Sequence, residues 1–403
     1  MKFKSLRDLD LSQKTVLVRV DLNVPVTDGQ VTDTTRIDRL KPTIDHLVAQ
    51  NAKILLFSHF GRPKGTPDPE LSLRFILPTL EKQWGHKIDF AEDCIGKPVH
   101  DLVKRMSHGT IGLLENARFH PGEKDNDPTF AKAVAEHADI YVNDAFSVAH
   151  RAHVSTHGLA KVLPTAAGLT MEAELKALNA SLEDPQKPVL AIAGGSKIST
   201  KINVLNNLVK KVDYLVLGGA MANTFLYAED VSVGSSMHES DMNETVRTIK
   251  QTAKDHNCVI LLPKDLTIVR DLKENADHEI VEKDSIPSYG KAVDIGPQTI
   301  EALTDIISEC KTVLWNGPLG VFECKPFDAG TNAIAKHVAA LTKQGTLTSV
   351  AGGGDTAAAI ENAETTADFS YVSTAGGAFL EWLEGKPLPG IEALDQQNID
   401  FAA

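Results

Sequence analysis

The chain has 403 residues, of which 42% are hydrophobic and 24% are charged, and its formal net charge is −13. This length favours two domains over one, and the composition is typical of globular proteins. The negative charge argues against a general nucleic-acid-binding or anionic-membrane surface.

The sequence shows neither a recognisable targeting segment nor a pattern of paired cysteines. The first residues contain no apolar run and no small-residue cleavage site, which argues against a signal peptide. No stretch reaches the roughly 20 apolar residues that span a bilayer. The four cysteines are scattered without a C-x-x-C pair, so they indicate neither a zinc site nor a disulfide framework. We therefore expect a reduced, cytoplasmic protein.

In the first half of the chain, short β-branched runs alternate with segments of helical apolar spacing. The strands expected there are 15–20, 52–58, 110–115 and 139–144. The helices expected between them are 36–50, 71–84 and 128–137. Such alternation indicates a mostly parallel sheet with helices on both faces.

The second half repeats this pattern after a helix-forming segment at 171–188. Its expected strands are 188–194, 213–219, 259–263, 312–317 and 347–353, and its expected helices are 199–211, 242–256 and 328–343. The prediction is an α/β protein of two Rossmann-like domains, 1–170 and 171–387, joined by a connecting helix and hinge.

The stretch LVRVDLNVP, at 17–25, combines two different faces. In an extended strand Val18, Val20, Leu22 and Val24 point to one side, which indicates core. Leu17, Arg19, Asp21 and Asn23 point to the other side. Ligands of parallel sheets bind beyond the carboxyl ends of strands, so Asp21 and Asn23 are candidate ligands. Arg19, deeper in the strand, is expected to orient them or other site residues and not to touch the substrate.

Arginine is confined almost entirely to the first half. Nine of the eleven arginines lie within residues 1–151, and the other two are Arg247 and Arg270. The arginine fork suits bidentate binding of carboxylate or phosphate. Four successive strand exits carry polar groups of this kind: Arg19/Asp21/Asn23, His59/Arg62, Arg118, and His150/Arg151/His153. Arg36 is expected at a helix N-terminus, where a cation is unfavourable unless an anion lies nearby.

The strand exits of the second half carry glycine instead. These exits read GGSKIST, GGAMANTF, NGPLGVFE, GGGDTAAA and STAGGAFLE. Glycine lets backbone N–H groups approach a phosphate closely. Lys197 and Lys201 add charges four residues apart, on one face of an expected helix. Asp355 is either a magnesium ligand or the N-cap of the following helix, and residue type favours the cap.

Two alternative classes remain open at this point. Gly352-x-Gly354-x-x-Ala357 fits the dinucleotide pattern of a dehydrogenase, although no clear acidic residue follows about 20 residues later. A hinged, two-lobed binding protein is the non-catalytic alternative. An arginine-rich anion site and a glycine-rich phosphate site together favour phosphoryl transfer between a small acid and a nucleotide.

Eight motifs in order along the whole chain resemble those of the phosphoglycerate kinase family. They read LVRVDLNVP, SHFGRP, LLENARFHPGE, DAFSVAHRAH, GGSKISTK, WNGPLGVFE, GGGDT and LPGIEAL. The resemblance implies a hinge-bending monomer that transfers the acyl-phosphate of 1,3-bisphosphoglycerate to MgADP, giving 3-phosphoglycerate and MgATP. It also implies that the tail at 388–403 packs back onto the first domain.

The same resemblance assigns roles by matching motif positions. For the acid it implies Asp21 and Asn23 at the glycerate hydroxyl and carboxylate, Arg36 at the reacting carboxylate, and His59, Arg62, Arg118 and Arg151 at the other phosphate. For the nucleotide it implies Lys201, Asn316, Glu323, Gly353, Gly354, Asp355 and Thr356, with Asp355 holding Mg²⁺. For the transferring phosphoryl group it implies Arg36, Lys197, Gly376 and Gly377.

One departure from the family pattern is visible. The family usually has three glycines where this chain has Ala375-Gly376-Gly377. Alanine disfavours positive φ and crowds a close backbone approach. We expect the change to be tolerated because the two later glycines remain.

Overall fold

The computed structural model describes residues 3–395, and these form two compact units. Unit 1 contains the described residues up to 175 together with 387–395, and unit 2 contains 176–386. The division falls inside helix α5 (Leu169–Leu178), which begins near the start of the expected connecting helix. Residues 396–403 of the expected tail lie outside the described part of the chain.

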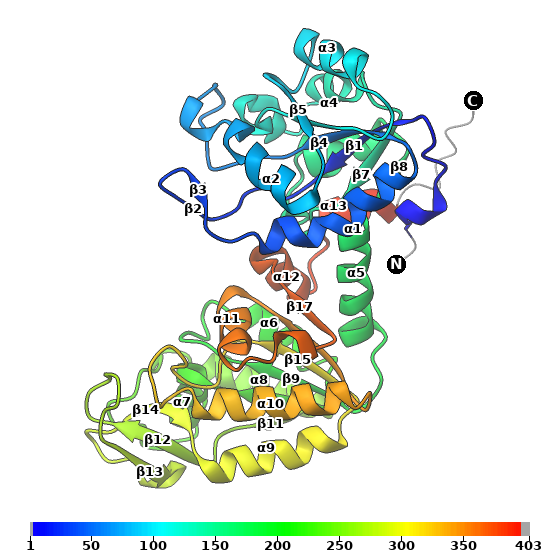
Figure 1. The fold of residues 1–403 in the computed structure, drawn as a ribbon. Coiled ribbons are helices and arrows are strands. Elements are labelled where there is room, and N and C mark those ends of the chain that lie inside the picture. The colour runs from blue at the N-terminus through cyan, green and yellow to red at the C-terminus, as the bar shows by residue number, and fades with distance from the viewer. Residues whose placement is uncertain (1–2, 396–403) are drawn as a thin grey trace. The chain divides into compact units, whose positions relative to one another are not determined.

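Unit 1 is built on a six-stranded sheet in the order β5-β6-β4-β1-β7-β8, and all its pairings are parallel (Figure 1). Its strands are β1 (Thr15–Arg19), β4 (Lys53–Phe57), β5 (Ile88–Ala91), β6 (Ile111–Leu114), β7 (Ile140–Asn143) and β8 (Thr165–Ala167). A short antiparallel hairpin, β2 (Val26–Thr27) and β3 (Gln30–Val31), follows β1. The four predicted strands of this half are confirmed, and β5 and β8 are additional.

Helices cover both faces of this sheet. They are α1 (Thr35–Ala49), α2 (Leu77–Trp84), α3 (Lys97–Arg105), α4 (Pro128–Ala135) and α13 (Pro389–Asp395). Val16 and Val18 pack in one core with α1 and α2, whereas Leu17 packs in a second core with α3, α4 and α13. Strand β1 is therefore buried on both faces, which explains its continuous β-branched and apolar run.

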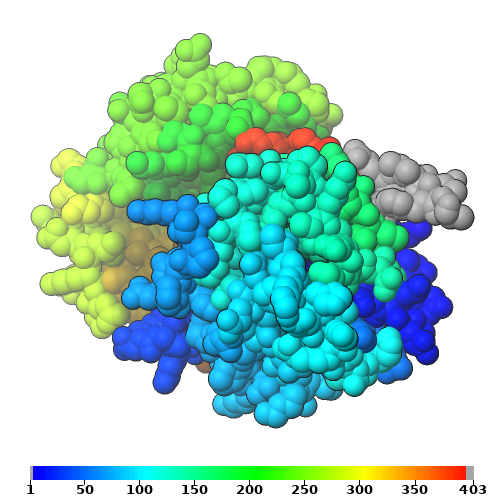
Figure 2. All heavy atoms as spheres, turned by 90° about the horizontal axis from the view of Figure 1, so that it is seen from above, coloured from blue at the N-terminus to red at the C-terminus, as the bar shows by residue number. Residues whose placement is uncertain are grey.

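The last described segment belongs to unit 1. Ala393 of α13 lies in the second core of that unit. The Gly390 N–H donates to the Ala149 carbonyl over 2.8 Å. In Figure 2, α13 is the red surface bordering the blue-green residues of unit 1.

Unit 2 is built on a second parallel sheet, in the order β11-β10-β9-β15-β16-β17. The strands are β9 (Val189–Ala193), β10 (Tyr214–Leu217), β11 (Val259–Leu261), β15 (Thr312–Asn316), β16 (Thr348–Gly352) and β17 (Tyr371–Ser373). All five predicted strands are confirmed. If these six strands are numbered 1 to 6 along the chain, their order across the sheet is 3-2-1-4-5-6. This is the doubly wound arrangement of Rossmann folds.

The helices of unit 2 are α6 (Ile202–Leu208), α7 (Gly219–Ala228), α8 (Asn243–Asp255), α9 (Pro297–Glu309), α10 (Ala329–Lys343), α11 (Gly354–Asn362) and α12 (Gly376–Leu383). Figure 1 shows α9 and α10 side by side, and their apolar residues share one core with β9, β15 and β16. An antiparallel sheet, β13-β12-β14, was not predicted; its strands are β12 (Asp265–Val269), β13 (His278–Glu282) and β14 (Lys291–Ile295).

Candidate active site

The polar residues of unit 1 gather where its sheet changes direction. Strand β1 pairs with β4 on one side and with β7 on the other, so their carboxyl ends meet at a topological switch point. The chain leaves these three ends through residues 20–23, 58–62 and 144–153. All the acid-binding residues that the sequence predicts, apart from Arg36 and Arg118, lie in these exits.

Arg19 ends β1 and is 2% exposed. Its Nε donates to the Ser155 hydroxyl over 3.0 Å, and its Nη1 donates to the Val20 carbonyl. Its Nη2 lies 2.8 Å from Nδ1 of His59. Arg19 is thus a buried support for the site, as the sequence analysis expects of it, and it holds the His59 ring in place.

His59 is neutral at physiological pH. Burial, followed by the charges of Arg19, Arg118 and Arg151, lowers its pKa well below the usual value. A guanidinium can only donate, so His59 Nδ1 accepts from Arg19 and the ring proton is on Nε2. The ring therefore offers a ligand an N–H donor and not a positive charge.

Arg118 lies in a short 3₁₀ segment (Ala117–Phe119) after β6 and is 5% exposed. Its Nη1 donates to the Gly61 carbonyl over 2.7 Å. Its Nε is buried and has no hydrogen-bond partner among the described residues. Burial and the nearby Arg151 and Arg19 lower its pKa to about 10, so it stays charged at neutral pH. An unsatisfied buried donor beside two other cations is energetically costly unless an anion binds there.

The other two arginines that are predicted to bind the phosphate are more accessible to solvent than Arg118. Arg62 is exposed, whereas Arg151 is half-buried and directs its Nε to Nε2 of His150 over 3.2 Å. Both contribute to the positive potential that lowers the pKa of Arg118. The cluster of Arg19, His59, Arg62, Arg118 and Arg151 is suited to a small, multiply charged anion.

Asp21, Asn23 and Arg36 form a second, connected group. Arg36 is the second residue of α1, at the helix N-terminus as predicted. Its Nη1 donates to Oδ2 of Asp21 and to the Asn23 carbonyl, both over 2.9 Å. Asp21 Oδ2 also accepts from the Ser147 hydroxyl over 2.5 Å, and Asn23 Oδ1 accepts from the Gly61 N–H over 2.9 Å. Asp21, in the β1 exit, thus compensates the charge of Arg36. This explains how a cation is tolerated at the N-terminus of α1.

Glu123, the last residue of LLENARFHPGE, was not predicted as a site residue. It is 1% exposed, and its two oxygens accept from the hydroxyl and the backbone N–H of Ser155 over 2.5 and 3.0 Å. Burial raises the pKa of this carboxyl, while Ser155 and Arg19 oppose the increase. Glu123 therefore balances part of the arginine charge through Ser155. A glutamate in a glycine-containing loop gives no sequence signal for such burial.

In unit 2, glycine follows strand after strand at the carboxyl edge of the sheet. Lys201 reaches back to this edge, and its Nζ donates to the Gly194 carbonyl over 2.7 Å and to Oδ1 of Asn316 over 2.8 Å. Burial lowers its pKa to about 8, and Asp355 opposes that decrease. Lys201 is mostly charged at neutral pH and is fixed between two strand ends.

The expectation that Lys197 and Lys201 share a helix face is wrong. Helix α6 begins at Ile202, and Lys201 occupies its N-cap position. Residues 194–201 form a loop in which the Thr200 hydroxyl donates to the Lys197 carbonyl over 3.0 Å. This local bond closes a turn before the helix begins, so Lys197 extends into solvent while Lys201 is half-buried.

Asp355 is not the N-cap of α11, contrary to the interpretation that residue type favoured. The cap is Gly353, whose φ of +99° suits glycine, and Asp355 lies in the first turn. Its side chain is exposed and makes no hydrogen bond or ion pair with any described residue. A carboxylate in this position is free to bind a metal ion that also contacts phosphate, which is how proteins commonly hold Mg²⁺.

Asn316 and Thr356 fix the backbone around Gly353. Asn316 Nδ2 donates to the Gly352 carbonyl, and the Gly317 N–H donates to the Thr356 hydroxyl, both over 2.7 Å. A Cβ on Gly353 would lie 2.8 Å from Asn316 Nδ2. Asn316 and Thr356 thus support the glycine turn, whereas Gly354 is exposed and open to a ligand.

Gly376 and Gly377 begin α12, and the N-cap before them is Ala375. Ala375 has φ −93° and ψ 96°, ordinary values for alanine, so this departure from three glycines causes no backbone strain. A Cβ on Gly376 would meet no atom within 4 Å, so the space beside this part of the backbone is open. Glu323 is exposed in the segment after β15.

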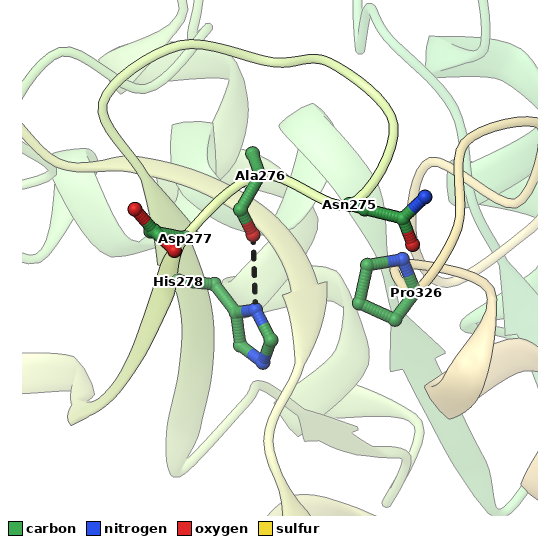
Figure 3. A pocket seen from close by; sticks show the side chains of 5 residues that line it. All are labelled: Asn275, Ala276, Asp277, His278 and Pro326. Atoms are coloured by element: carbon green, nitrogen blue, oxygen red, sulfur yellow. Dashed lines mark hydrogen bonds between the residues drawn. The ribbon is translucent and has the colours of Figure 1, made fainter.

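A separate pocket of unit 2 is lined by Asn275, Ala276, Asp277, His278 and Pro326 (Figure 3). In it His278 turns back so that its Nδ1 lies 3.2 Å from the Ala276 carbonyl. None of the predicted site residues lines this pocket.

No described helix is long and apolar enough to cross a membrane.

Unit 1 has a parallel sheet whose strand exits carry arginine and histidine, and unit 2 has a parallel sheet whose strand exits carry glycine and lysine. Together these features define a phosphotransferase of the kinase class. The family model for phosphoglycerate kinase matches residues 6–386. The phosphoglycerate kinase of Sinorhizobium fredii is 56% identical over 399 residues, covering 99% of this chain and 100% of the relative. The chain belongs to the phosphoglycerate kinase family.

Solved structures agree with this assignment. The phosphoglycerate kinase structure from Coxiella burnetii has a TM-score of 0.91 at 41% identity and covers 98% of this chain and 99% of its own. The one from Pyrococcus horikoshii has a TM-score of 0.79 at 27% identity and covers 97% and 98%. The two-domain α/β prediction is confirmed, and family membership favours the kinase over the dehydrogenase and binding-protein alternatives.

Proposed function

We propose that this chain catalyses the reversible transfer of a phosphoryl group from 1,3-bisphosphoglycerate to MgADP, giving 3-phosphoglycerate and MgATP, in glycolysis and gluconeogenesis. Family membership supports the reaction. The single structural observation that carries the proposal is the arginine cluster at the β1, β4, β6 and β7 exits, in which Arg19 and Arg118 are buried; it matches an acid bearing several negative charges.

Unit 1 would bind the acid. Arg62, Arg118 and Arg151 would hold the phosphate that is not transferred, with His59 donating from Nε2. The buried Nε of Arg118, without a partner among the described residues, supports this role. Asp21 and Asn23 would bind the glycerate hydroxyl and carboxylate region.

Unit 2 would bind the nucleotide. Lys201 and the N–H groups of Gly353 and Gly354 would contact the phosphate chain, with Asn316 and Thr356 holding that turn. Glu323 would bind the ribose hydroxyls. Asp355 would hold the Mg²⁺, and this ion would neutralise phosphate charge when bound.

The transfer requires no general base. In the ATP-forming direction an ADP oxygen attacks the acyl-phosphate phosphorus, and the bond to the carboxylate oxygen breaks. In reverse a carboxylate oxygen attacks the γ-phosphorus, and with a pKa near ~4 it is already ionised at neutral pH. Catalysis then consists of in-line alignment and neutralisation of the equatorial oxygens. Arg36, Lys197 and the N–H groups of Gly376 and Gly377 would supply the positive charge and hydrogen bonds. Hinge closure, which the family resemblance implies, would exclude water.

A cytoplasmic monomer is part of the proposal. All four cysteines are free, which is consistent with a reducing compartment. The partners are small molecules: 3-phosphoglycerate or 1,3-bisphosphoglycerate, and ATP or ADP. Neither nucleic acid nor membrane is expected.

A coupled assay of the purified protein tests the activity. We expect phosphorylation of 3-phosphoglycerate that requires both ATP and Mg²⁺. Absence of this activity in folded protein would refute the proposal, and hydride transfer with a nicotinamide cofactor would restore the dehydrogenase alternative.

Replacing the exposed Arg62 by alanine should raise KM for 3-phosphoglycerate about 10- to 100-fold, with a smaller effect on kcat, because one charge-assisted contact to the phosphate is lost. Steady-state kinetics at saturating ATP measure this change. Arg74→Ala is the matched control, since Arg74 is also an exposed arginine of unit 1 but pairs with Glu92. An unchanged KM in Arg62→Ala would remove Arg62 from the anion site.

Nucleotide affinity should fall with increasing pH above about 8. The Lys201 pKa of about 8 means that its charge is lost above this pH in the free protein. A bound phosphate favours the charged form of Lys201, so above this pH the nucleotide binds together with a proton. The affinity for the nucleotide therefore falls about tenfold per pH unit. Calorimetric titration with ADP between about pH 7 and 9.5 measures the slope. Lys201→Arg keeps its charge and should flatten the profile; an equal slope in this variant would contradict the assignment.

A further inference from the structure

A cluster of three potential metal ligands lies at the β5–β6 edge of the unit 1 sheet, beyond the carboxyl ends of these strands. Asp93 and Cys94 follow β5, and His120 follows the 3₁₀ segment after β6. One donor atom of each residue lies within 4.8 Å of the donor atoms of the other two. Among the described residues, this is the single group of His, Cys, Asp or Glu side chains with such spacing.

Two of the three side chains already contact each other. His120 Nε2 lies 2.7 Å from Oδ1 of Asp93, and the ring of His120 stacks on Phe130 with centroids 4.8 Å apart. The backbone N–H of Cys94 donates to the same Asp93 oxygen over 2.6 Å. The carboxylate and the imidazole thus face each other before any ion binds, and a bound ion would replace the contact between them.

The surroundings of the thiol also favour a cation. Cys94 is 1% exposed and packs in an apolar core. The carboxylates of Asp93, Glu123 and Glu115 lie near enough to act on the thiol electrostatically. The same negative groups attract a divalent ion, which would displace the thiol proton to the buffer on binding.

We propose that Asp93, Cys94 and His120 form a binding site for a thiophilic divalent metal ion such as Zn²⁺. The Asp93 and His120 side chains are 39% and 26% exposed, so an ion can enter from solvent and keep a water as its fourth ligand. Ligand atoms around tetrahedral zinc lie roughly 3.3–3.6 Å apart. Binding therefore requires the Asp93 and His120 ligand atoms, now 2.7 Å apart, to separate by about 0.6–0.9 Å and Cys94 Sγ to move inwards. The site is independent of the proposed kinase function.

This ligand set discriminates against Mg²⁺. Magnesium prefers oxygen ligands, whereas thiolate and imidazole select zinc or its spectroscopic substitute Co²⁺. The site is therefore chemically distinct from the proposed MgADP site at Asp355. Bound metal would connect the β5 exit to the loop after β6 and stabilise unit 1 against unfolding.

The experiment titrates reduced, metal-free protein with Co²⁺ in excess Mg²⁺, which occupies oxygen-ligand sites. We expect one equivalent of Co²⁺ to produce a near-ultraviolet thiolate-to-cobalt band together with visible bands of four-coordinate cobalt. One equivalent of Zn²⁺ should abolish both signals. Zn²⁺ should also raise the unfolding temperature of the protein.

Two variants and a matched control locate the ion. Cys94→Ser should lose the charge-transfer band. His120→Asn, at a partly exposed position, should weaken Zn²⁺ binding by more than the roughly 10- to 100-fold typical of outer-shell changes. Cys310→Ser, which alters another buried thiol, should bind as the unaltered protein does. Circular dichroism checks the fold of each variant, and if Cys94→Ser does not fold, His120→Asn decides the question.

Several results would overturn the proposal. They are the absence of a thiolate band, Zn²⁺ affinity that is unchanged in folded His120→Asn, or equal losses in Cys94→Ser and Cys310→Ser.

Discussion

Replacing Arg36 by alanine should lower kcat for phosphoryl transfer by about 100- to 1,000-fold, the loss typical when one preorganised donor to transition-state charge is removed. Nucleotide affinity should stay within about twofold, because Arg36 belongs to the acid-binding unit. The guanidinium is already oriented, since Nη1 is bonded to Asp21 and to the Asn23 carbonyl. Its remaining nitrogens are then available to the reacting carboxylate.

Steady-state kinetics measure kcat of Arg36→Ala, and ADP titrations measure its nucleotide affinity. Arg39→Ala is the control for general effects on α1, because Arg39 lies one turn further along the same helix. Equal losses of turnover and nucleotide affinity in Arg36→Ala would show that Arg36 does not act on the transferring group.

Replacing Arg19 by methionine should lower the free energy of unfolding of unit 1 by about 3–5 kcal/mol. The variant keeps apolar bulk but removes the buried cation that offsets Glu123, and it leaves Nδ1 of His59 and the Ser155 hydroxyl without their donor. This expectation rests on a fully buried charge network, whereas exposed arginines contribute little.

Hydrogen exchange of the β1 and β4 amides reports the opening free energy of this unit. Arg105→Met is the matched control: Arg105 is exposed and donates to the Phe90 carbonyl, so its loss should change stability by no more than about 0.5 kcal/mol. A decrease below about 1 kcal/mol in Arg19→Met would mean that the network does not stabilise unit 1.

Much of the fold follows from patterns along the chain. Continuous β-branched runs such as Thr15–Arg19 and Val189–Ala193 predict strands buried on both faces, and the structure places both inside parallel sheets. Strand β13 escaped prediction because four of its five residues are exposed, so charged side chains obscure its β signal. Helix α3 escaped for a related reason, since only Val99 and Leu102 of its nine residues are buried.

The site was predictable where a residue type is itself the signal. Arginine and histidine at strand exits indicated the group of cations that the structure brings together, and glycine at the exits of unit 2 indicated the open backbone found at Gly354 and Gly376. What sequence could not provide was the tertiary balance of charge. The burial of Glu123 and the neutral state of His59 both depend on contacts between distant segments. The turn that separates Lys197 from Lys201 is closed by a local hydrogen bond, which residue spacing alone does not reveal.

If unit 1 binds the acid and unit 2 binds the nucleotide, paired titrations of the two ligands should separate the two sites. Calorimetry of 3-phosphoglycerate and ADP binding is compared among the unaltered protein, Arg118→Met and Lys201→Met. We expect Arg118→Met to weaken 3-phosphoglycerate binding by about 10- to 100-fold and to leave ADP affinity within about twofold, and Lys201→Met to do the reverse. Loss of both ligands in each folded variant, or of neither, would contradict this expectation.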